Sequence, residues 1–149
     1  MEHRAQPGHS NATPGRLGNA LVVEDELIVA LAMADSLTQA GAGEVAVCHT
    51  TALALAELER LRPAILVLDV HLADRDDGWA LAELALAISP TPPLIVFSTA
   101  TPESIPPHVA QTGHVLAKPF PPDALATLVQ RHLGRQPGLL GRLRNALSH

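Results

Sequence analysis

The sequence predicts an α/β fold in which helices pack on a doubly wound parallel sheet, and three observations support this. Short apolar runs alternate along the chain with longer segments rich in alanine and leucine, which is typical of βαβ units. Apolar residues make up 47% of the chain but aromatic residues only 2%, so the core is built from small aliphatic side chains that suit a buried parallel sheet. The length of 149 residues suits one domain with a substantial core.

Five short apolar runs are expected to form the strands. Each run is bounded by turn-forming residues or by a helical segment, which favours strands over buried helices. Because a helical segment separates consecutive runs, the strands are expected to lie parallel in one sheet. The runs cover residues 20–23, 44–48, 64–68, 94–98 and 114–117.

The first two connections between these runs carry helical patterns. In the first, Leu27, Leu31 and Ala34 share one face at helical spacing before Gly41 stops the helix. In the second, residues 53–61 repeat the pattern. Both segments are therefore expected to be helices.

The later connections differ in how strongly they predict a helix. Residues 79–88 form a third helical segment, and residues 123–133 form a fifth one that Gly134 closes. The fourth connection contains Pro106-Pro107, and proline both lacks an N–H donor and disfavours helix in the residue before it. The fourth helix is expected to be short or distorted.

The two ends of the chain are expected to lie outside the domain. Residues 1–18 are rich in proline, glycine and polar residues, which predicts a disordered leader before a domain over 19–134. Residues 135–149 form a short basic amphipathic tail, with four leucines and Arg142 and Arg144 between them. A frayed end packed on its own domain is favoured for this tail over a helix that binds a partner.

Composition excludes several classes of function. The net charge is −5 and no dense block of lysine or arginine occurs, so direct nucleic-acid binding is not expected. Cys48 is the single cysteine, which rules out an intrachain disulfide and a cysteine-based zinc cluster and fits a reducing cytosol. The longest apolar stretches are too short to span a bilayer and no signal-peptide pattern is present. A cytoplasmic protein without membrane insertion is expected.

Polar residues follow the expected strands where each strand ends. Glu24 and Asp25 follow the first strand, Asp69 ends the third, Ser98 ends the fourth and Lys118 follows the fifth. In open α/β sheets, ligands bind beyond the carboxyl ends of the strands, near the point where the strand order reverses. Three carboxylates, one hydroxyl and one ammonium are therefore expected on one edge of the sheet.

This set of side chains suits phosphoryl transfer. A carboxylate can act as the nucleophile, while a divalent cation and a lysine neutralise charge on the phosphoryl oxygens. Clustered carboxylates without a cysteine ligand or a histidine pair favour Mg²⁺ over zinc. The sequence thus predicts a magnesium-dependent phosphoryl site.

The motifs that carry this site occur in one order along the chain. Over residues 20–133 their arrangement resembles that of the bacterial response-regulator receiver family. The family has a flavodoxin-like (βα)5 fold with strand order 2-1-3-4-5, which implies that the first and third strands are neighbours here and bring Asp25 and Asp69 together. The matching segments are 21–26, 66–70, Asp77-Gly78, 94–98 and 118–120.

The resemblance also implies a role for each site residue. Asp69 matches the phosphoacceptor and Lys118 the lysine that contacts the phosphoryl group. Ser98 matches the switch serine or threonine. For Mg²⁺, the family pattern implies three direct protein ligands, the carboxylates of Asp25 and Asp69 and the backbone carbonyl of His71, while Glu24 reaches the metal through a water molecule.

The function implied is that of a stand-alone response regulator in a two-component phosphorelay. A histidine kinase or histidine phosphotransfer protein would phosphorylate Asp69, and the signal would pass to a downstream protein by direct interaction. Such a protein promotes its own phosphorylation and dephosphorylation but is not an enzyme with an independent substrate. Homodimerisation through the fourth or fifth helix is compatible with the family. Val115 stands where many members carry an aromatic switch residue, which argues against coupling through an aromatic side chain.

Three alternatives are compatible with parts of this pattern. The protein could act as a phosphate sink or shuttle for a shared kinase, or as a degenerate receiver that only binds partners. The fold also permits a small-molecule or nucleotide binder. No glycine-rich phosphate loop follows the first strand, however, and Glu24 and Asp25 would repel an anionic ligand there.

Overall fold

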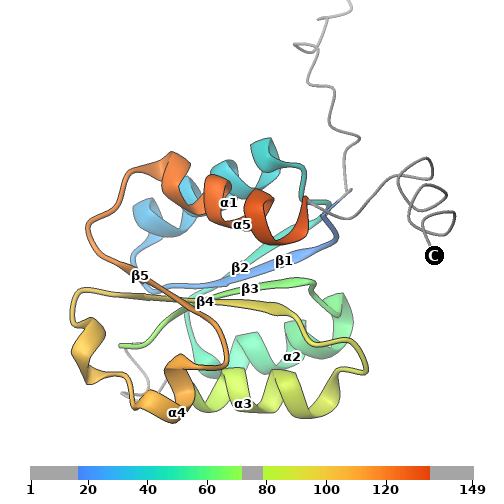
Figure 1. Cartoon of the computed structure of the whole chain (residues 1–149). Helices are drawn as coiled ribbons and strands as arrows, with labels where there is room; N and C mark the ends of the chain where they lie inside the picture. Colours follow the sequence, from blue (N-terminus) through green and yellow to red (C-terminus); the bar gives the residue numbers. More distant parts are fainter. Residues whose placement is uncertain (1–16, 72–78, 135–149) are drawn as a thin grey trace, which may run out of the picture.

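A five-stranded parallel sheet covered by helices on both faces forms the described part of the chain, residues 17–71 and 79–134 of the computed structural model (Figure 1). The strand order β2-β1-β3-β4-β5 confirms the expected one. All neighbouring strands pair in parallel. The strands are β1 (Ala20–Val23), β2 (Val45–Cys48), β3 (Ile65–Asp69), β4 (Leu94–Thr99) and β5 (His114–Ala117).

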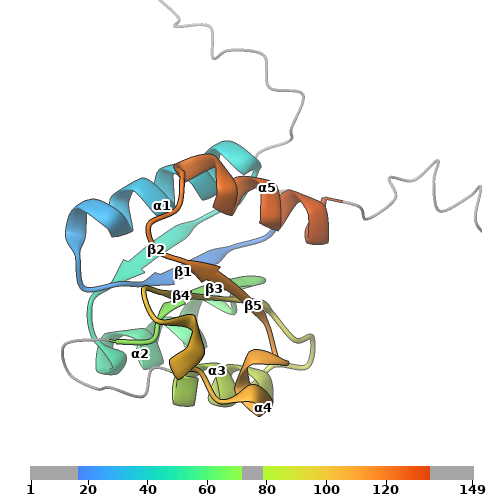
Figure 2. The same ribbon diagram turned by 60° about the vertical axis from the view of Figure 1, so that its left-hand side comes forward.

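The helices divide between the two faces of the sheet. In Figures 1 and 2, α1 and α5 lie side by side on one face, while α2, α3 and α4 cover the other. This division follows from the reversal of strand order at β1 and β3, because right-handed crossovers in opposite directions place their helices on opposite faces. The helices are α1 (Leu27–Ala40), α2 (Thr51–Leu61), α3 (Trp79–Ile88), α4 (Pro107–Ala110) and α5 (Pro122–Leu133).

The fourth connection contains little helix, as the prolines predict. A 3-10 helix, η1 (Pro102–Ser104), precedes α4, which is four residues long. Pro107 occupies the first position of α4, where its missing N–H costs nothing. The expected short or distorted fourth helix is therefore confirmed.

Two residues of the expected leader pack against the domain. Leu17 and Gly18 fall in the expected leader, but Leu17 is buried and its N–H donates to the carbonyl of Gly41. Gly18 has a φ of 85°, and a Cβ there would lie 2.7 Å from the Cβ of Ala64, so only glycine fits. The rest of the leader, the tail over 135–149 and the Asp77-Gly78 motif lie outside the described residues.

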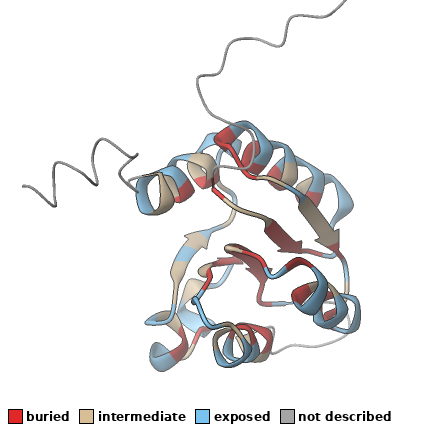
Figure 3. Ribbon diagram, turned by 90° about the vertical axis from the view of Figure 1, so that its right-hand side faces the viewer, coloured by how far each residue is buried: buried red, intermediate tan, exposed pale blue. Residues whose placement is uncertain are grey.

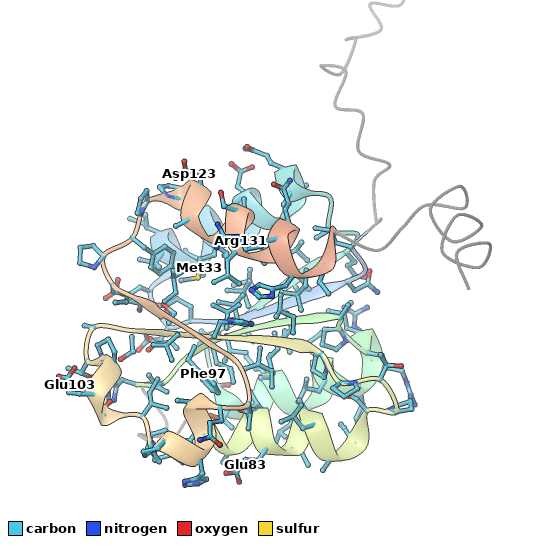
Figure 4. The ribbon with its side chains drawn as sticks, viewed as in Figure 1. Met33, Glu83, Phe97, Glu103, Asp123 and Arg131 are labelled. Carbon is cyan, nitrogen blue, oxygen red and sulfur yellow. The ribbon has the colours of Figure 1, made fainter. Side chains whose placement is uncertain are left out.

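Two apolar clusters fill the layers above and below the sheet. Alternate residues of each strand point to opposite faces, so Leu21 and Phe97 join the cluster under α2 and α3, while Val22 joins the one under α1 and α5. Figure 3 shows buried residues on the strands and on the helix sides that face them. In Figure 4, Phe97 lies between the layers and Glu83 points to solvent.

The buried face of α1 is not the face that carries Leu27 and Leu31. These two side chains are 66% and 54% exposed, whereas Ala30, Met33 and Leu37 are buried. Apolar residues occur on most sides of this helix, so helical periodicity alone does not identify the side that packs on the sheet. The result is an apolar solvent-facing side of α1 next to the carboxyl edge of the sheet.

Two leucines of α1 provide a test of this assignment. Leu37→Ala is expected to lower the free energy of unfolding by about 2–5 kcal/mol, because it leaves a cavity under α1. Leu31→Ala is expected to lower it by less than about 1 kcal/mol, because half of that side chain is already in water. Urea denaturation measures both values, and equal losses in the two variants would contradict the observed orientation of α1.

Candidate functional site

Three carboxylates meet beyond the carboxyl ends of β1 and β3. Glu24 and Asp25 directly follow β1, and Asp69 is the last residue of β3. One carboxylate oxygen from each residue lies within 4.8 Å of the others. The pairing of β1 with β3 produces this cluster, since the two strands end side by side.

Lys118 brings an ammonium to the same place from the end of β5. Its Nζ lies 3.1 Å from both carboxylate oxygens of Glu24 and 3.6 Å from Oδ2 of Asp69. The backbone N–H of Lys118 donates to the carbonyl of Thr99, which fixes the start of the turn that carries the side chain. One ammonium therefore contacts two of the three carboxylates.

The site is buried on one side and open on the other. Glu24 is 1% exposed and Asp69 is 6% exposed, whereas Asp25 is exposed. Burying carboxylates without full compensation is costly. Solvent or a ligand can reach the cluster from the side of Asp25.

The charges of the site are incompletely balanced. Burial and, to a lesser extent, repulsion by Asp69 raise the pKa of Glu24 to about 7, because the contact with Lys118 offsets only part of the rise. Burial alone would lower the pKa of Lys118, but the carboxylates of Glu24 and Asp69 outweigh it and raise that pKa. A further cation at this position would relieve the remaining repulsion.

Ser98 lies beside Asp69 on the neighbouring strand. The two residues are paired in the β3–β4 register, so their side chains emerge on the same face of the sheet. Ser98 is fully buried. Within the described residues, its Oγ is buried and has no hydrogen-bond partner. Leaving such a group unsatisfied costs about 1–3 kcal/mol, which indicates that a ligand atom belongs next to it.

His71 contacts Asp69 through its backbone. Its N–H donates to Oδ1 of Asp69 at 3.0 Å, which holds the carboxylate in one orientation. Its imidazole reaches across to the segment after β4, where Nε2 lies 3.1 Å from Oγ1 of Thr101. Val115 lies on β5 and is 37% exposed.

The sequence analysis missed a set of hydroxyl groups beside this site. β4 continues to Thr99, which is 1% exposed and accepts a hydrogen bond on Oγ1 from the backbone of Thr101. Ser104 bonds to both the hydroxyl and the carbonyl of Thr101. The sequence does carry a sign of this set, because residues 98, 99 and 101 all bear hydroxyl groups. Only the first of them was named as a candidate site residue.

The donor set fits a hard divalent cation. The three carboxylates offer oxygen ligands only, which suits Mg²⁺ better than a softer metal. Mg²⁺ keeps several water ligands when bound to proteins, and the exposure of Asp25 leaves room for them. The uncompensated negative charge around Glu24 and Asp69 is a second reason for a cation to bind here.

Comparisons with known proteins agree with the fold. A family model described as "Response regulator receiver domain" matches residues 20–130. A CheY-like receiver domain from Methylobacillus flagellatus has a TM-score of 0.67 at 20% identity, covering 76% of this chain and 97% of that one. The receiver domain of the PhyR response regulator from Erythrobacter litoralis has a TM-score of 0.70 at 22% identity, covering 86% and 95%.

A longer protein shows the same likeness. Response regulator DrrB from Thermotoga maritima has a TM-score of 0.67 at 25% identity, covering 80% of this chain and 54% of that one, so this chain spans about half the length of DrrB. No functionally curated protein matches the sequence. Among the described helices, none has the length and apolarity needed to cross a membrane.

The raised pKa of Glu24 predicts how stability depends on pH without metal. The carboxyl has a pKa of about 7 in the folded protein against an ordinary value of 4.5, so the folded state keeps a proton that the unfolded state loses. The stability that this retained proton gives the folded state is fully present below pH 4.5 and is lost as the pH rises through about 7.

In metal-free buffer, the free energy of unfolding is therefore expected to fall between about pH 5 and pH 8 by on the order of 2 kcal/mol. Glu24→Gln should remove most of this dependence, whereas Glu103→Gln, at an exposed position (Figure 4), should retain it. Urea denaturation across this pH range measures the slope. A slope unchanged in Glu24→Gln would show that another group is responsible.

Proposed function

The chain belongs to the response regulator receiver family, and on that premise we propose that Asp69 accepts a phosphoryl group from a histidine kinase or histidine phosphotransfer protein, with Mg²⁺ as the cofactor. One observation carries this proposal: Asp69 is buried beside Glu24, Asp25 and Lys118 at the carboxyl edge of the sheet. The protein would promote its own phosphorylation and dephosphorylation rather than turn over a separate substrate. A cytoplasmic location and output through a downstream protein belong to the same proposal.

The geometry assigns a task to each side chain in the transfer. An oxygen of Asp69 attacks the phosphorus of a phosphohistidine in line, so that a P–O bond forms while the P–N bond breaks and the imidazole leaves. The N–H of His71 holds the carboxylate through Oδ1. The ammonium of Lys118, next to Oδ2, balances charge on the phosphoryl oxygens. Asp25 and Asp69 directly, and Glu24 through a water molecule, would hold Mg²⁺, which would supply positive charge to neutralise the same oxygens.

Ser98 completes the site after transfer. Its buried hydroxyl has no partner within the described residues, and a phosphoryl oxygen on Asp69 would accept its hydrogen bond. Such a bond is present only in the phosphorylated form, so it favours the conformation of β4 and its following loop that allows it. This is how the chemistry at Asp69 would bias the protein between two states.

An apolar surface beside the site supports a protein as the phosphoryl donor. A pocket of about 460 Å³ lies between α1 and the start of α5, and its lining includes Ile28, Lys118 and Phe120. Ile28 is 85% exposed and lies on α1 with the exposed Leu27 and Leu31. Apolar exposed surface of this kind marks contact with a partner. A docked partner would therefore sit within reach of Asp69.

The proposal predicts a covalent adduct on one residue. Incubation with acetyl phosphate and Mg²⁺ is expected to add one phosphoryl group to the wild-type protein and none to Asp69→Asn. Asp123→Asn, at an exposed position on α5, serves as the matched control and should be modified like the wild type. Intact-mass spectrometry with and without Mg²⁺ measures the adduct. A wild-type protein that is folded, binds Mg²⁺ and yet stays unmodified by acetyl phosphate and by a cognate kinase would overturn the proposal.

The metal part of the proposal has its own test. Asp25→Asn is expected to weaken Mg²⁺ binding by at least about tenfold. Losses of this size follow even when the mutated residue only hydrogen-bonds to a metal ligand. Asp35→Asn removes an exposed carboxylate further along α1 and should leave the affinity unchanged. Isothermal titration calorimetry gives both constants, and equal affinities in the two variants would exclude Asp25 as a ligand.

A further inference from the structure

A network of hydrogen bonds joins the phosphoacceptor strand to the segment after β4. Thr101 lies at its centre: its Oγ1 is 3.1 Å from Nε2 of His71, 3.2 Å from Oγ of Ser104 and 3.4 Å from Oγ1 of Thr99. Thr99 ends β4 and Ser104 ends η1. Three elements, the end of β3, the end of β4 and η1, therefore meet at one hydroxyl.

The number of available protons fixes the direction of these bonds. Ser104 donates its proton to the carbonyl of Thr101 at 2.7 Å, so its Oγ accepts from the Thr101 hydroxyl. Thr101 has then used its only hydroxyl proton and accepts from both other neighbours. All of these contacts are satisfied together in the tautomer of His71 that carries its proton on Nε2 and donates it to Thr101.

His71 contacts the phosphoacceptor with one end and Thr101 with the other. Its backbone N–H donates to Oδ1 of Asp69 at 3.0 Å, and its side chain donates to Thr101. A phosphoryl group on Asp69 changes the charge and position of the carboxylate that the N–H contacts. Any shift of the His71 backbone in response would also move the imidazole relative to Thr101.

We propose that the hydrogen bond between His71 and Thr101 transmits the state of Asp69 to residues 102–110, so that His71 and Thr101 are positioning residues of this site. The inference rests on the proposed function, because the change at Asp69 is its phosphorylation. The segment that receives the signal comprises η1 and α4. Its helices are short and separated by Pro106, so few helical hydrogen bonds oppose its movement.

Two substitutions at Thr101 separate the hydroxyl from the shape of the side chain. Thr101→Val removes the hydroxyl and keeps the branched shape, whereas Thr101→Ser keeps the hydroxyl. Each protein is held in acetyl phosphate and Mg²⁺, and hydrogen–deuterium exchange of residues 102–110 is compared with the same protein without acetyl phosphate. Intact mass is recorded in parallel to measure the adduct on Asp69.

The wild-type protein and Thr101→Ser are expected to change exchange over 102–110 on phosphorylation. Thr101→Val is expected to form the same adduct and to lose most of that change. If Thr101→Val forms the adduct and shows the wild-type change, or if no variant changes exchange in this segment, the inference is wrong while the proposed function stands. If the wild-type protein forms no adduct with acetyl phosphate or kinase, the proposed function fails and the inference fails with it.

Discussion

The ammonium of Lys118 is the group on which the edge of the sheet depends. Glu24 and Asp69 are both nearly inaccessible to solvent, and two carboxylates in such a place repel each other and lose hydration. Lys118 contacts both, but one positive charge offsets only one negative charge. This partial charge balance depends on the strand order. The order places the ends of β1 and β3 next to each other and leaves β5 close enough for the side chain of Lys118 to reach both carboxylates.

The strands could be predicted from the sequence because a buried parallel sheet imposes local rules, and their order was implied by the family resemblance. The central strands β1, β3 and β4 are mainly apolar and are buried on both faces, and a helical segment separates each strand from the next. The side of α1 that packs on the sheet could not be predicted, since Leu27 and Leu31 offer as good an apolar face as Met33 and Leu37. The burial of Leu17 could not be predicted either, since the apolar cluster that it joins is built from residues distant in sequence.

The charged residues of the site could be anticipated for a similar reason. Polar side chains that directly follow apolar strands must lie at the sheet edge, so their convergence required only the topology. The hydroxyl network around Thr101 required more: its contacts join residues from three elements, and nothing in the local sequence marks His71 and Thr101 as neighbours. The raised pKa of Glu24 likewise comes from its burial and from Asp69, neither of which a sequence pattern reports.

The packing of Leu17 and Gly18 bears on where a shortened form of this chain should begin. Leu17 fills part of the cluster under α1 and α5, and Gly18 passes so close to Ala64 that no side chain fits there. At the other end, Leu133 packs partly against the same cluster. The family match covers residues 20–130 and stops short of both leucines. A shortened protein cut at those limits would lose apolar contacts at both ends, so it is expected to be less stable than a fragment that spans Leu17 to Leu133.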